Sequence, residues 1–332
     1  MEYKSTRGYS GWAQLAILLV FLGIGLIFAG LIQFYIGSKA LGNSTLEIAE
    51  KGTAMMKALM KPENLNYAQT AQVFGVFFLL FFPSIAYILI CHKNLFWAGF
   101  SKHFNYKQII IAFLIISAAS FFASPFADIS KTFFTHYPYW NALAKTAEIN
   151  YNDAIASMTG LHTSTQFIMG IFLIAFLPGL FEEFFFRGVL QNLFMRWWKK
   201  PALAIIITSI LFSLVHASYY LFISRFILGC ALGLLFYKSK NIWVNIFAHF
   251  INNLIALMQL FYLNNKTGIK PNINDMDTPL PVWSVFITFA ILYGLFILFE
   301  KISVNNRQKI INEEGSYVSG DNPFDTYEKQ LN

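Results

Sequence analysis

Long apolar runs separated by short polar segments make up most of this chain. A helix needs about 20 predominantly apolar residues to cross a bilayer, and eight runs approach or exceed that length. They are Trp12–Ile36, Ala71–Ile90, Gln108–Phe126, Gln166–Trp198, Ala202–Ala217, Leu221–Tyr237, Ile242–Leu263 and Val282–Phe299. The pattern predicts an all-α, polytopic membrane helix bundle of about eight transmembrane helices.

The composition supports a membrane protein and excludes an ordinary soluble domain. Of the 332 residues, 56% are hydrophobic and only 12% are charged, whereas a soluble domain is about 25% charged. The two cysteines, Cys91 and Cys230, lie at the end of one apolar run and inside another, so no disulfide scaffold is expected. An integral, multi-pass membrane protein in contact with the lipid bilayer is the class that remains.

The distribution of Lys and Arg predicts the orientation. With the N-terminus inside, the inner segments hold 14 of the 24 Lys and Arg residues and the outer segments hold 8. Cytoplasmic loops carry such an excess, so both termini are expected to be cytoplasmic. The same rule accounts for the net charge of +7, and no nucleic-acid partner is expected. The sequence assigns no oligomeric state.

Ionisable residues inside the apolar runs are rare. A charge at membrane depth costs at least about 2.5 kcal/mol, so such a residue marks function by default. Counted at 1.5 Å per residue from the cytoplasmic helix ends, the polar groups on three different helices share one layer of the bilayer. These groups are Glu182, Glu183, Arg187, His216, His249 and Asn253.

Helical spacing divides these groups into pairs. Glu183 and Arg187 are four residues apart and can form a salt bridge. Glu182 is rotated by about 100° from Glu183 and points elsewhere. His249 and Asn253 also share a helix face. A buried Glu–Arg pair is also a common way to fasten helices, and this structural interpretation of Glu183 and Arg187 stays open.

Two further features have structural interpretations. Arg225 stands near the outer end of its helix, where a long cationic side chain can extend to the membrane surface. Gly229 and Gly233 form a small-xxx-small pattern that allows close helix approach.

The remaining residues fit hydrolysis of a peptide bond. A carboxylate and an imidazole, here Glu182 and His216, can activate a water molecule. A second imidazole and an amide, here His249 and Asn253, can donate hydrogen bonds to a developing oxyanion. In the alternative, Glu182, His216 and His249 bind zinc with one open position. No cofactor is firmly expected, and zinc stays open.

The order of these residues resembles a known family. Glu182 and Glu183 with Arg187, then Phe212 with His216, then His249 with Asn253 are similar to the three-motif signature of the CPBP family. These are the CAAX-prenyl-protease and bacteriocin-processing intramembrane endopeptidases, also called the Abi family. The resemblance covers about residues 166–263.

The resemblance implies a role for each residue. Glu182 with His216 corresponds to the water-activating pair, and His249 with Asn253 to the oxyanion-stabilising pair. Glu183, Arg187 and Phe212 correspond to the residues that support the site. Whether the enzyme is of the glutamate type or metal-dependent is left open by the family. The implied partner is a peptide or protein substrate at the membrane, and the expected location is the cytoplasmic membrane of a bacterium.

Other functions are weighed beside this one. Some relatives confer immunity or serve as scaffolds, so a non-enzymatic membrane protein of the same family is the alternative. A small transporter would place matching polar groups in two inverted halves, and the first three apolar runs lack them.

The chain divides into four expected parts. Residues 1–165 hold three transmembrane helices and two outer loops, at about 37–70 and 127–165, the first with a short surface helix at Leu46–Met60. A CPBP-like catalytic core, a loop with the last transmembrane helix, and a polar tail expected to be disordered follow. Their bounds are 166–263, 264–303 and 304–332.

Overall fold

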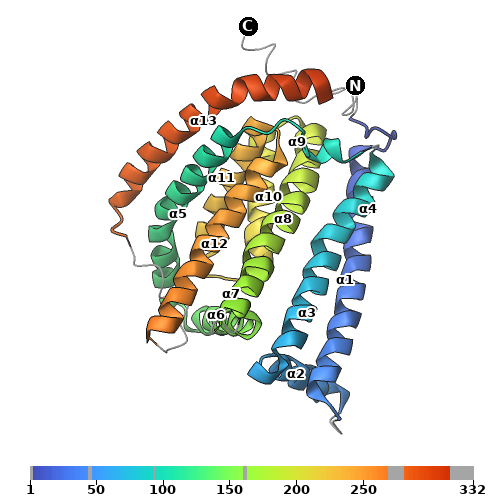
Figure 1. Ribbon diagram of the computed structural model, residues 1–332, viewed down its shortest axis with the longest axis vertical. Coiled ribbons are helices and arrows are strands. Elements are labelled where there is room, and N and C mark those ends of the chain that lie inside the picture. The colour runs from blue at the N-terminus through green and yellow to red at the C-terminus, as the bar shows by residue number, and fades with distance from the viewer. Residues whose placement is uncertain (1–2, 44–46, 93, 160–162, 268–279, 315–332) are drawn as a thin grey trace.

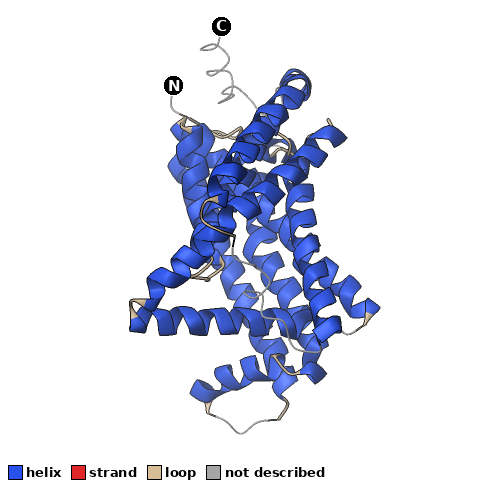
Figure 2. Ribbon diagram, turned by 90° about the vertical axis from the view of Figure 1, so that its left-hand side faces the viewer, coloured by secondary structure: helices blue, strands red, loops and turns tan. Residues whose placement is uncertain are grey.

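The computed structural model describes residues 3–43, 47–92, 94–159, 163–267 and 280–314. In these ranges all regular elements are helices, apart from one isolated bridge between Lys4 and Ser10 (Figures 1 and 2). The elements are α1 (Gly11–Leu41), α2 (Ile48–Leu59), η1 (Pro62–Asn64), α3 (Leu65–Val76), η2 (Phe77–Phe81), α4 (Phe82–Cys91), η3 (Leu95–Ala98), α5 (Tyr106–Thr135), α6 (Pro138–Thr159), α7 (Ser164–Gly170), η4 (Ile171–Phe176), α8 (Leu177–Glu183), η5 (Phe184–Gln191), α9 (Asn192–Trp198), α10 (Pro201–Val215), α11 (Phe222–Ser239), α12 (Ile242–Thr267) and α13 (Ser284–Glu314).

The all-α, polytopic membrane bundle is confirmed. In the described ranges, seven helical stretches are long and apolar enough to cross a membrane: Gly11–Leu41, Pro62–Cys91, Tyr106–Thr135, Ser164–Trp198, Phe222–Ser239, Ile242–Leu263 and Ser284–Glu314. The fifth of the eight expected spans differs. It forms α10, whose 15 residues rise only about 22 Å against a hydrocarbon core of about 30 Å. Because α10 is this short, the turn after it lies before the far end of the bundle.

Two of the long helical stretches contain wide, π-helical turns. In Pro62–Cys91, η2 comes directly before Phe82 and Pro83, and in Ser164–Trp198, η4 comes directly before Leu177 and Pro178. Proline lacks an N–H, and its ring clashes with the preceding turn, so a wider turn at these places keeps each stretch continuous. The third wide turn, η5, contains no proline and begins just after the two glutamates. Wide turns of this kind occur often at functional sites.

Close packing of α11 against its neighbours depends on two glycines. A Cβ atom at Gly229 would lie 3.0 Å from Ser209 Cβ on α10, and one at Gly233 would lie 2.8 Å from Ile205 Cγ2. The expected role of this small-xxx-small pattern in helix approach is confirmed. It brings the backbone of α11 within reach of side chains on η5.

Two segments expected to be irregular are helical. The second outer loop, 127–165, consists largely of the end of α5 and of α6, which lies across the lower end of the bundle (Figures 1 and 2). The expected disordered tail from residue 304 is wrong for its first part, because α13 continues to Glu314. Residues 315–332 lie outside the described ranges. The short helix expected in the first loop is present as α2.

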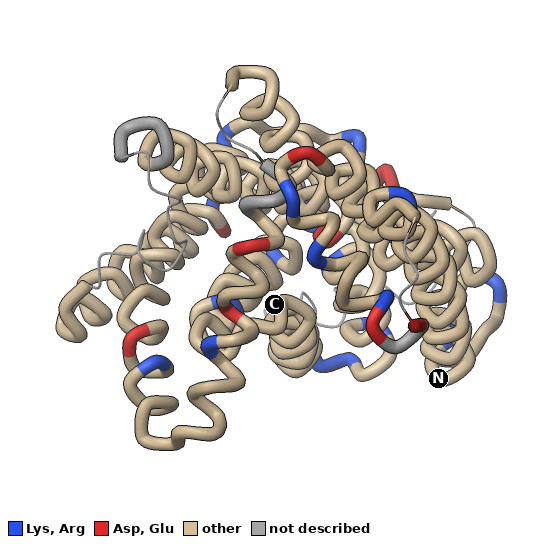
Figure 3. The backbone as a smooth tube through the Cα atoms, turned by 90° about the horizontal axis from the view of Figure 1, so that it is seen from below, with Lys and Arg blue, Asp and Glu red and all other residues tan. Residues whose placement is uncertain are grey.

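The start of α1 and the end of α13 lie at the same end of the bundle (Figure 1). Glu314 Oε1 accepts hydrogen bonds from Ser101 Oγ and from the Lys102 backbone N–H, at 3.1 and 2.9 Å. Few acidic or basic residues interrupt the helices elsewhere in the described chain (Figure 3). Both ends on one side agree with the expected topology, and the assignment of that side to the cytoplasm stays a prediction.

Candidate functional site

A fully buried ion pair forms the centre of the candidate site. Arg187 Nη1 lies 2.7 Å from Glu183 Oε1, and the two side chains are 2% and 0% exposed. The spacing of four residues predicts this pair. Arg187 Nη2 also donates to the Gly229 carbonyl at 3.2 Å, which ties η5 to α11 at the close approach described above.

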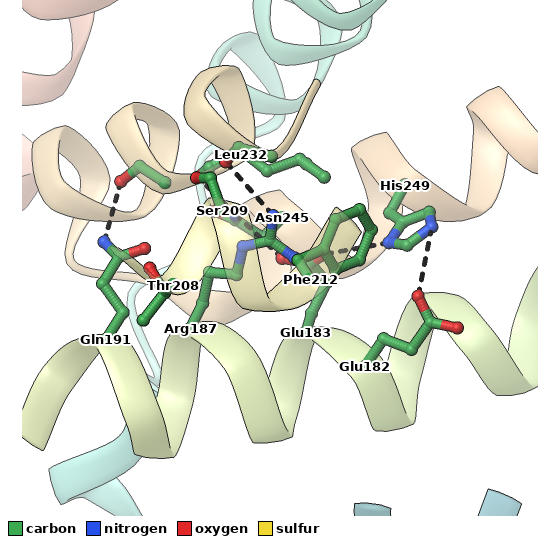
Figure 4. A network of polar contacts seen from close by, with 12 residues as sticks. Glu182, Glu183, Arg187, Gln191, Thr208, Ser209, Phe212, Leu232, Asn245 and His249 are labelled. Carbon is green, nitrogen blue, oxygen red and sulfur yellow. Dashed lines mark hydrogen bonds and ion pairs between the residues drawn. The ribbon is translucent and has the colours of Figure 1, made fainter. Parts of the chain in front are cut away.

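Glu183 connects a third helix to this pair. His249 Nδ1 donates to Glu183 Oε1 at 2.8 Å, and Asn245 Nδ2 donates to Glu183 Oε2 at 3.1 Å (Figure 4). A buried carboxylate is tolerated when its oxygens are paired and hydrogen-bonded, and both oxygens of Glu183 are engaged. The environment of Glu183 is thus that of a structural anchor.

Glu182 lies in a different environment from its neighbour. Its Oε2 is buried and has no hydrogen-bond partner among the described residues. It lies 3.8 Å from His216 Nε2 and 4.0 Å from His249 Nε2. Figure 4 shows the His249 ring between the two glutamates. Two histidine side chains, from the turn after α10 and from α12, therefore converge on one carboxylate oxygen of Glu182 in α8.

The second nitrogen of each histidine has its own partner. His216 Nδ1 lies 2.8 Å from the Phe212 carbonyl. A carbonyl oxygen can only accept, so His216 Nδ1 carries a proton and donates it, while Nε2 faces Glu182. His249 Nδ1 likewise donates to the Glu183 carboxylate. Both Nε2 atoms are therefore oriented toward Glu182 by their partners.

Phe212 packs between the charged groups. Its ring centroid lies 4.5 Å from Arg187 Cζ, 4.7 Å from the His216 ring and 6.1 Å from the His249 ring. A ring face within about 6 Å attracts a guanidinium. Phe212 thus contacts Arg187 and both histidine rings, and its ring helps to fix their positions.

Asn253 is the one sequence-predicted site residue that binds outside this cluster in the described part of the chain. Its Nδ2 donates to the Ile174 carbonyl in η4 at 3.3 Å, and its second N–H is left over. The missed member of the cluster is Asn245. The row Asn245, His249 and Asn253 repeats every four residues along α12, and this repeat is the signal that points to Asn245.

Arg225 does not extend away from the bundle as expected. Its Nη1 donates to the His216 carbonyl at 3.3 Å, and its guanidinium lies 4.9 Å from the ring centroid of Tyr151 on α6. The expectation of a side chain reaching for the membrane surface is wrong. The cation is instead turned toward the backbone of a site residue.

Zinc would need the ligand atoms of Glu182, His216 and His249 closer together than the structure places them. A tetrahedral zinc ion with bonds of about 2.0–2.1 Å sets neighbouring ligand atoms about 3.3 Å apart. The separations from Glu182 to the histidines are wider, at 3.8 and 4.0 Å. Within the described part of the chain, no three His, Cys, Asp or Glu side chains are grouped to hold a metal ion. These residues do not fit zinc in this arrangement.

Fold and site together define an integral, multi-pass membrane protein with a cluster of ionisable side chains at membrane depth. Residues 164–255 match the family model of the Rce1-like type II CAAX prenyl endopeptidases. The resemblance to this family is confirmed for the segment that carries Glu182, His216 and His249. At the level of the family, the match supports an intramembrane protease of the CAAX type.

One curated relative is similar over part of its length. The uncharacterized protein YyaK of Bacillus subtilis is 26% identical over 138 residues, which cover 38% of this chain and 46% of the relative. The match thus spans less than half of that protein. No solved structure matches the chain.

Proposed function

We propose that this chain is an intramembrane endopeptidase that hydrolyses a peptide bond with a water molecule activated by Glu182 and His216. One observation carries the proposal: Glu182 Oε2 is buried, has no hydrogen-bond partner among the described residues, and faces two histidine Nε2 atoms. Most buried polar atoms in structural networks are paired, so an unpaired carboxylate oxygen that faces two histidine nitrogens favours a catalytic role over a fastening one.

The separation of Glu182 and His216 suits a water molecule between two proton acceptors. With contacts of about 2.8 Å to each, a water oxygen can touch Glu182 Oε2 and His216 Nε2 when these atoms are 3.8 Å apart. The Nε2 lone pair of neutral His216 and the carboxylate both accept protons. On attack, the proton passes to this pair, which then returns it to the leaving amine.

The oxyanion of the tetrahedral intermediate requires donors. His249 Nδ1 already donates to Glu183, so its Nε2 can donate to the oxyanion only when both ring nitrogens carry a proton. We assign this role to His249 Nε2. The second N–H of Asn253, whose amide is oriented by Ile174, is the other donor. Glu183, Arg187 and Phe212 hold the histidines in place.

The proposed catalytic core is residues 166–263, and the substrate is a peptide or protein segment that enters the membrane. The CAAX and bacteriocin-processing activities of the family define the substrates to try first. The proposed location is the cytoplasmic membrane of a bacterium. The side chains that meet at the centre of the cluster are glutamate, histidine and arginine, and they support a water-activating mechanism.

The deciding experiment is peptide cleavage by the purified full-length protein in detergent or liposomes. Prenylated and unprenylated peptides are compared, before and after prolonged incubation with a metal chelator. We expect cleavage that is abolished in Glu182→Ala and unchanged by the chelator. Loss of cleavage with chelator and recovery with zinc would contradict the metal-free mechanism. A cellular phenotype that survives Glu182→Ala, without cleavage by the wild type, would favour the immunity or scaffold role.

A further inference from the structure

Helix α6, which lies outside the family match at 164–255, contacts the turn that carries His216. This turn, residues 216–221, joins α10 to α11 and is called the histidine turn below. Ser218 Oγ donates to Glu148 Oε2 at 2.8 Å, and the Tyr220 hydroxyl donates to Asn141 Oδ1 at 2.6 Å. Two side chains of α6 are thus bonded directly to the turn, across 70 and 79 residues of sequence.

A third connection runs through Arg225. Its guanidinium packs on the ring of Tyr151, 4.9 Å from the centroid, and its Nη1 donates to the His216 carbonyl at 3.3 Å. Burial raises the pKa of the Tyr151 phenol. The Arg225 cation opposes this rise, and the carboxylates of Glu182 and Glu148 add to it. These neighbours show that the Tyr151 side chain extends from α6 toward the Glu182 cluster.

The histidine turn has a backbone conformation that needs support. Ala217, the residue after His216, has a φ of +50°. The left-handed region is unfavourable for a residue with a Cβ atom, and such residues persist where the surrounding structure over-determines them. Within the turn, the Ala217 N–H donates to Leu214 and the Leu221 N–H to Ser218 Oγ. Ser218 is therefore shared between the turn and α6.

We propose that α6 is a positioning element of the site, in which Glu148 acts through Ser218, and Tyr151 through Arg225, to keep His216 directed at Glu182. The proposal rests on the proposed function only in assigning His216 a part in catalysis. The positioning of the ring is a separate claim with its own measurement.

Glu148, which accepts the hydrogen bond from Ser218, is itself buried. Its side chain is 4% exposed, and its other carboxylate oxygen has no hydrogen-bond partner among the described residues. The hydrogen bond from Ser218 to this buried side chain is shielded from competition with water. Such a contact fits an element that holds a strained turn.

The first test compares two substitutions of Tyr151 in the full-length protein. Tyr151→Leu removes the ring from Arg225, whereas Tyr151→Phe keeps it. A displacement of about 1 Å in a catalytic group can cost on the order of 10²-fold in rate. We therefore expect Tyr151→Leu to lower kcat by roughly 10- to 100-fold with KM nearly unchanged, and Tyr151→Phe to keep most of the wild-type kcat.

The matched controls are Tyr139→Leu and Tyr139→Phe. Tyr139 lies on the same helix and is 75% exposed, so neither change should alter kcat. Ser218→Ala is the second variant for the case that Tyr151→Leu fails to fold. It removes the bond to Glu148 and should also lower kcat. An equal loss in Tyr151→Phe and Tyr151→Leu, or a change confined to KM, would overturn the positioning role, because the hydroxyl or a substrate contact would then be responsible.

The second test needs no substrate and separates the two proposals. The ring resonances of ¹⁵N-labelled His216 are assigned by their loss in His216→Gln and then followed in each variant. We expect them to shift in Tyr151→Leu and Ser218→Ala but not in Tyr151→Phe or the Tyr139 controls. Shifts of this kind in a protein that cleaves no peptide would refute the proposed function while supporting the positioning. Unchanged resonances in both turn variants would refute the positioning, whatever the protein cleaves.

Discussion

Glu182 and Glu183 are adjacent in sequence but have opposite surroundings. Glu183 is fully buried and accepts hydrogen bonds from Arg187, His249 and Asn245. Glu182 is 15% exposed, and its Oε2 lacks a hydrogen-bond partner in the described ranges. The rotation of about 100° between neighbouring helical residues separates the two carboxylates. Removing the charge of Glu182 and removing the cation that pairs with Glu183 should therefore have different consequences.

The first prediction contrasts Glu182→Gln with Arg187→Ala. Gln has nearly the shape of Glu, so Glu182→Gln should express and unfold like the wild type but lack activity. Arg187→Ala leaves a buried carboxylate without its cation, which typically costs about 3–5 kcal/mol, so this variant should express poorly and unfold at lower temperature. Thermal unfolding and cleavage assays in detergent measure both effects. Equal expression with equal residual activity in the two variants would refute this division of roles.

The second prediction concerns the oxyanion. Loss of one oxyanion donor costs about 10²–10³ in turnover, so Asn253→Ala should remain folded and bind substrate but turn over that much more slowly. Asn252→Ala is the matched control, because Asn252 lies next in the chain and accepts a hydrogen bond from Ser120 on α5 instead. Steady-state kinetics distinguish the two variants. Wild-type turnover in Asn253→Ala would remove this residue from the mechanism.

At the scale of elements, η5 and α11 are joined by a ladder of side chain to backbone hydrogen bonds. Arg187 donates to the Gly229 carbonyl and Gln191 donates to the Gly233 carbonyl, at 3.2 and 3.0 Å. Each donor and each acceptor is one helical turn from the next. Because these bonds reach the backbone of α11, they require that no side chain stand between the helices.

The third prediction follows from this close approach. In Gly233→Ala, the new Cβ would lie 2.8 Å from Ile205 Cγ2 and 2.9 Å from Gln191 Oε1, so the helices must shift. Overpacking of this kind costs typically about 1–3 kcal/mol, and the midpoint of thermal unfolding should fall. Gly30→Ala in α1 is the control, since nothing lies within 4 Å of its added Cβ. A midpoint for Gly233→Ala equal to that of the control would show that the approach is not tight.

At the scale of the whole molecule, the helices form a bundle with both described ends on one side and α6 across the other (Figures 1 and 2). The contacts of Glu314 with Ser101 and Lys102 fix the end of α13 to the segment after η3. The charge distribution predicts that this side faces the cytoplasm.

The fourth prediction is this topology. Single cysteines are introduced by Lys309→Cys on α13 and Gly52→Cys on α2, both at exposed positions, after replacement of Cys91 and Cys230 by serine. A membrane-impermeant thiol reagent applied to intact cells should label residue 52 and not residue 309. After permeabilisation it should label both. Labelling of residue 309 in intact cells would reverse the orientation.

Much of the bundle could be predicted from the local pattern, because each long apolar run indicates one helix. The sequence-based prediction failed mainly at the ends of these helices. The polar residues after 303 were expected to be disordered, yet α13 continues through them to Glu314, where Ser101 and Lys102 bind its carboxylate. Such contacts join residues more than 200 positions apart and leave no trace in local hydropathy. The bounds of α10 are close to the expected run Ala202–Ala217, but its 15 residues are too few to cross the bilayer, so the run does not form a full span.

For the candidate site, the sequence by itself determined which ionisable residues lie at membrane depth and which of them share a helix face. The pair of Glu183 with Arg187 follows from a spacing of four residues. Only the tertiary structure decided that His216 and His249 both turn toward Glu182, that Asn253 binds Ile174, and that α6 packs on the histidine turn. The physical reason is that helical periodicity fixes directions within one helix. The rotation and approach of separate helices depend on how their side chains pack.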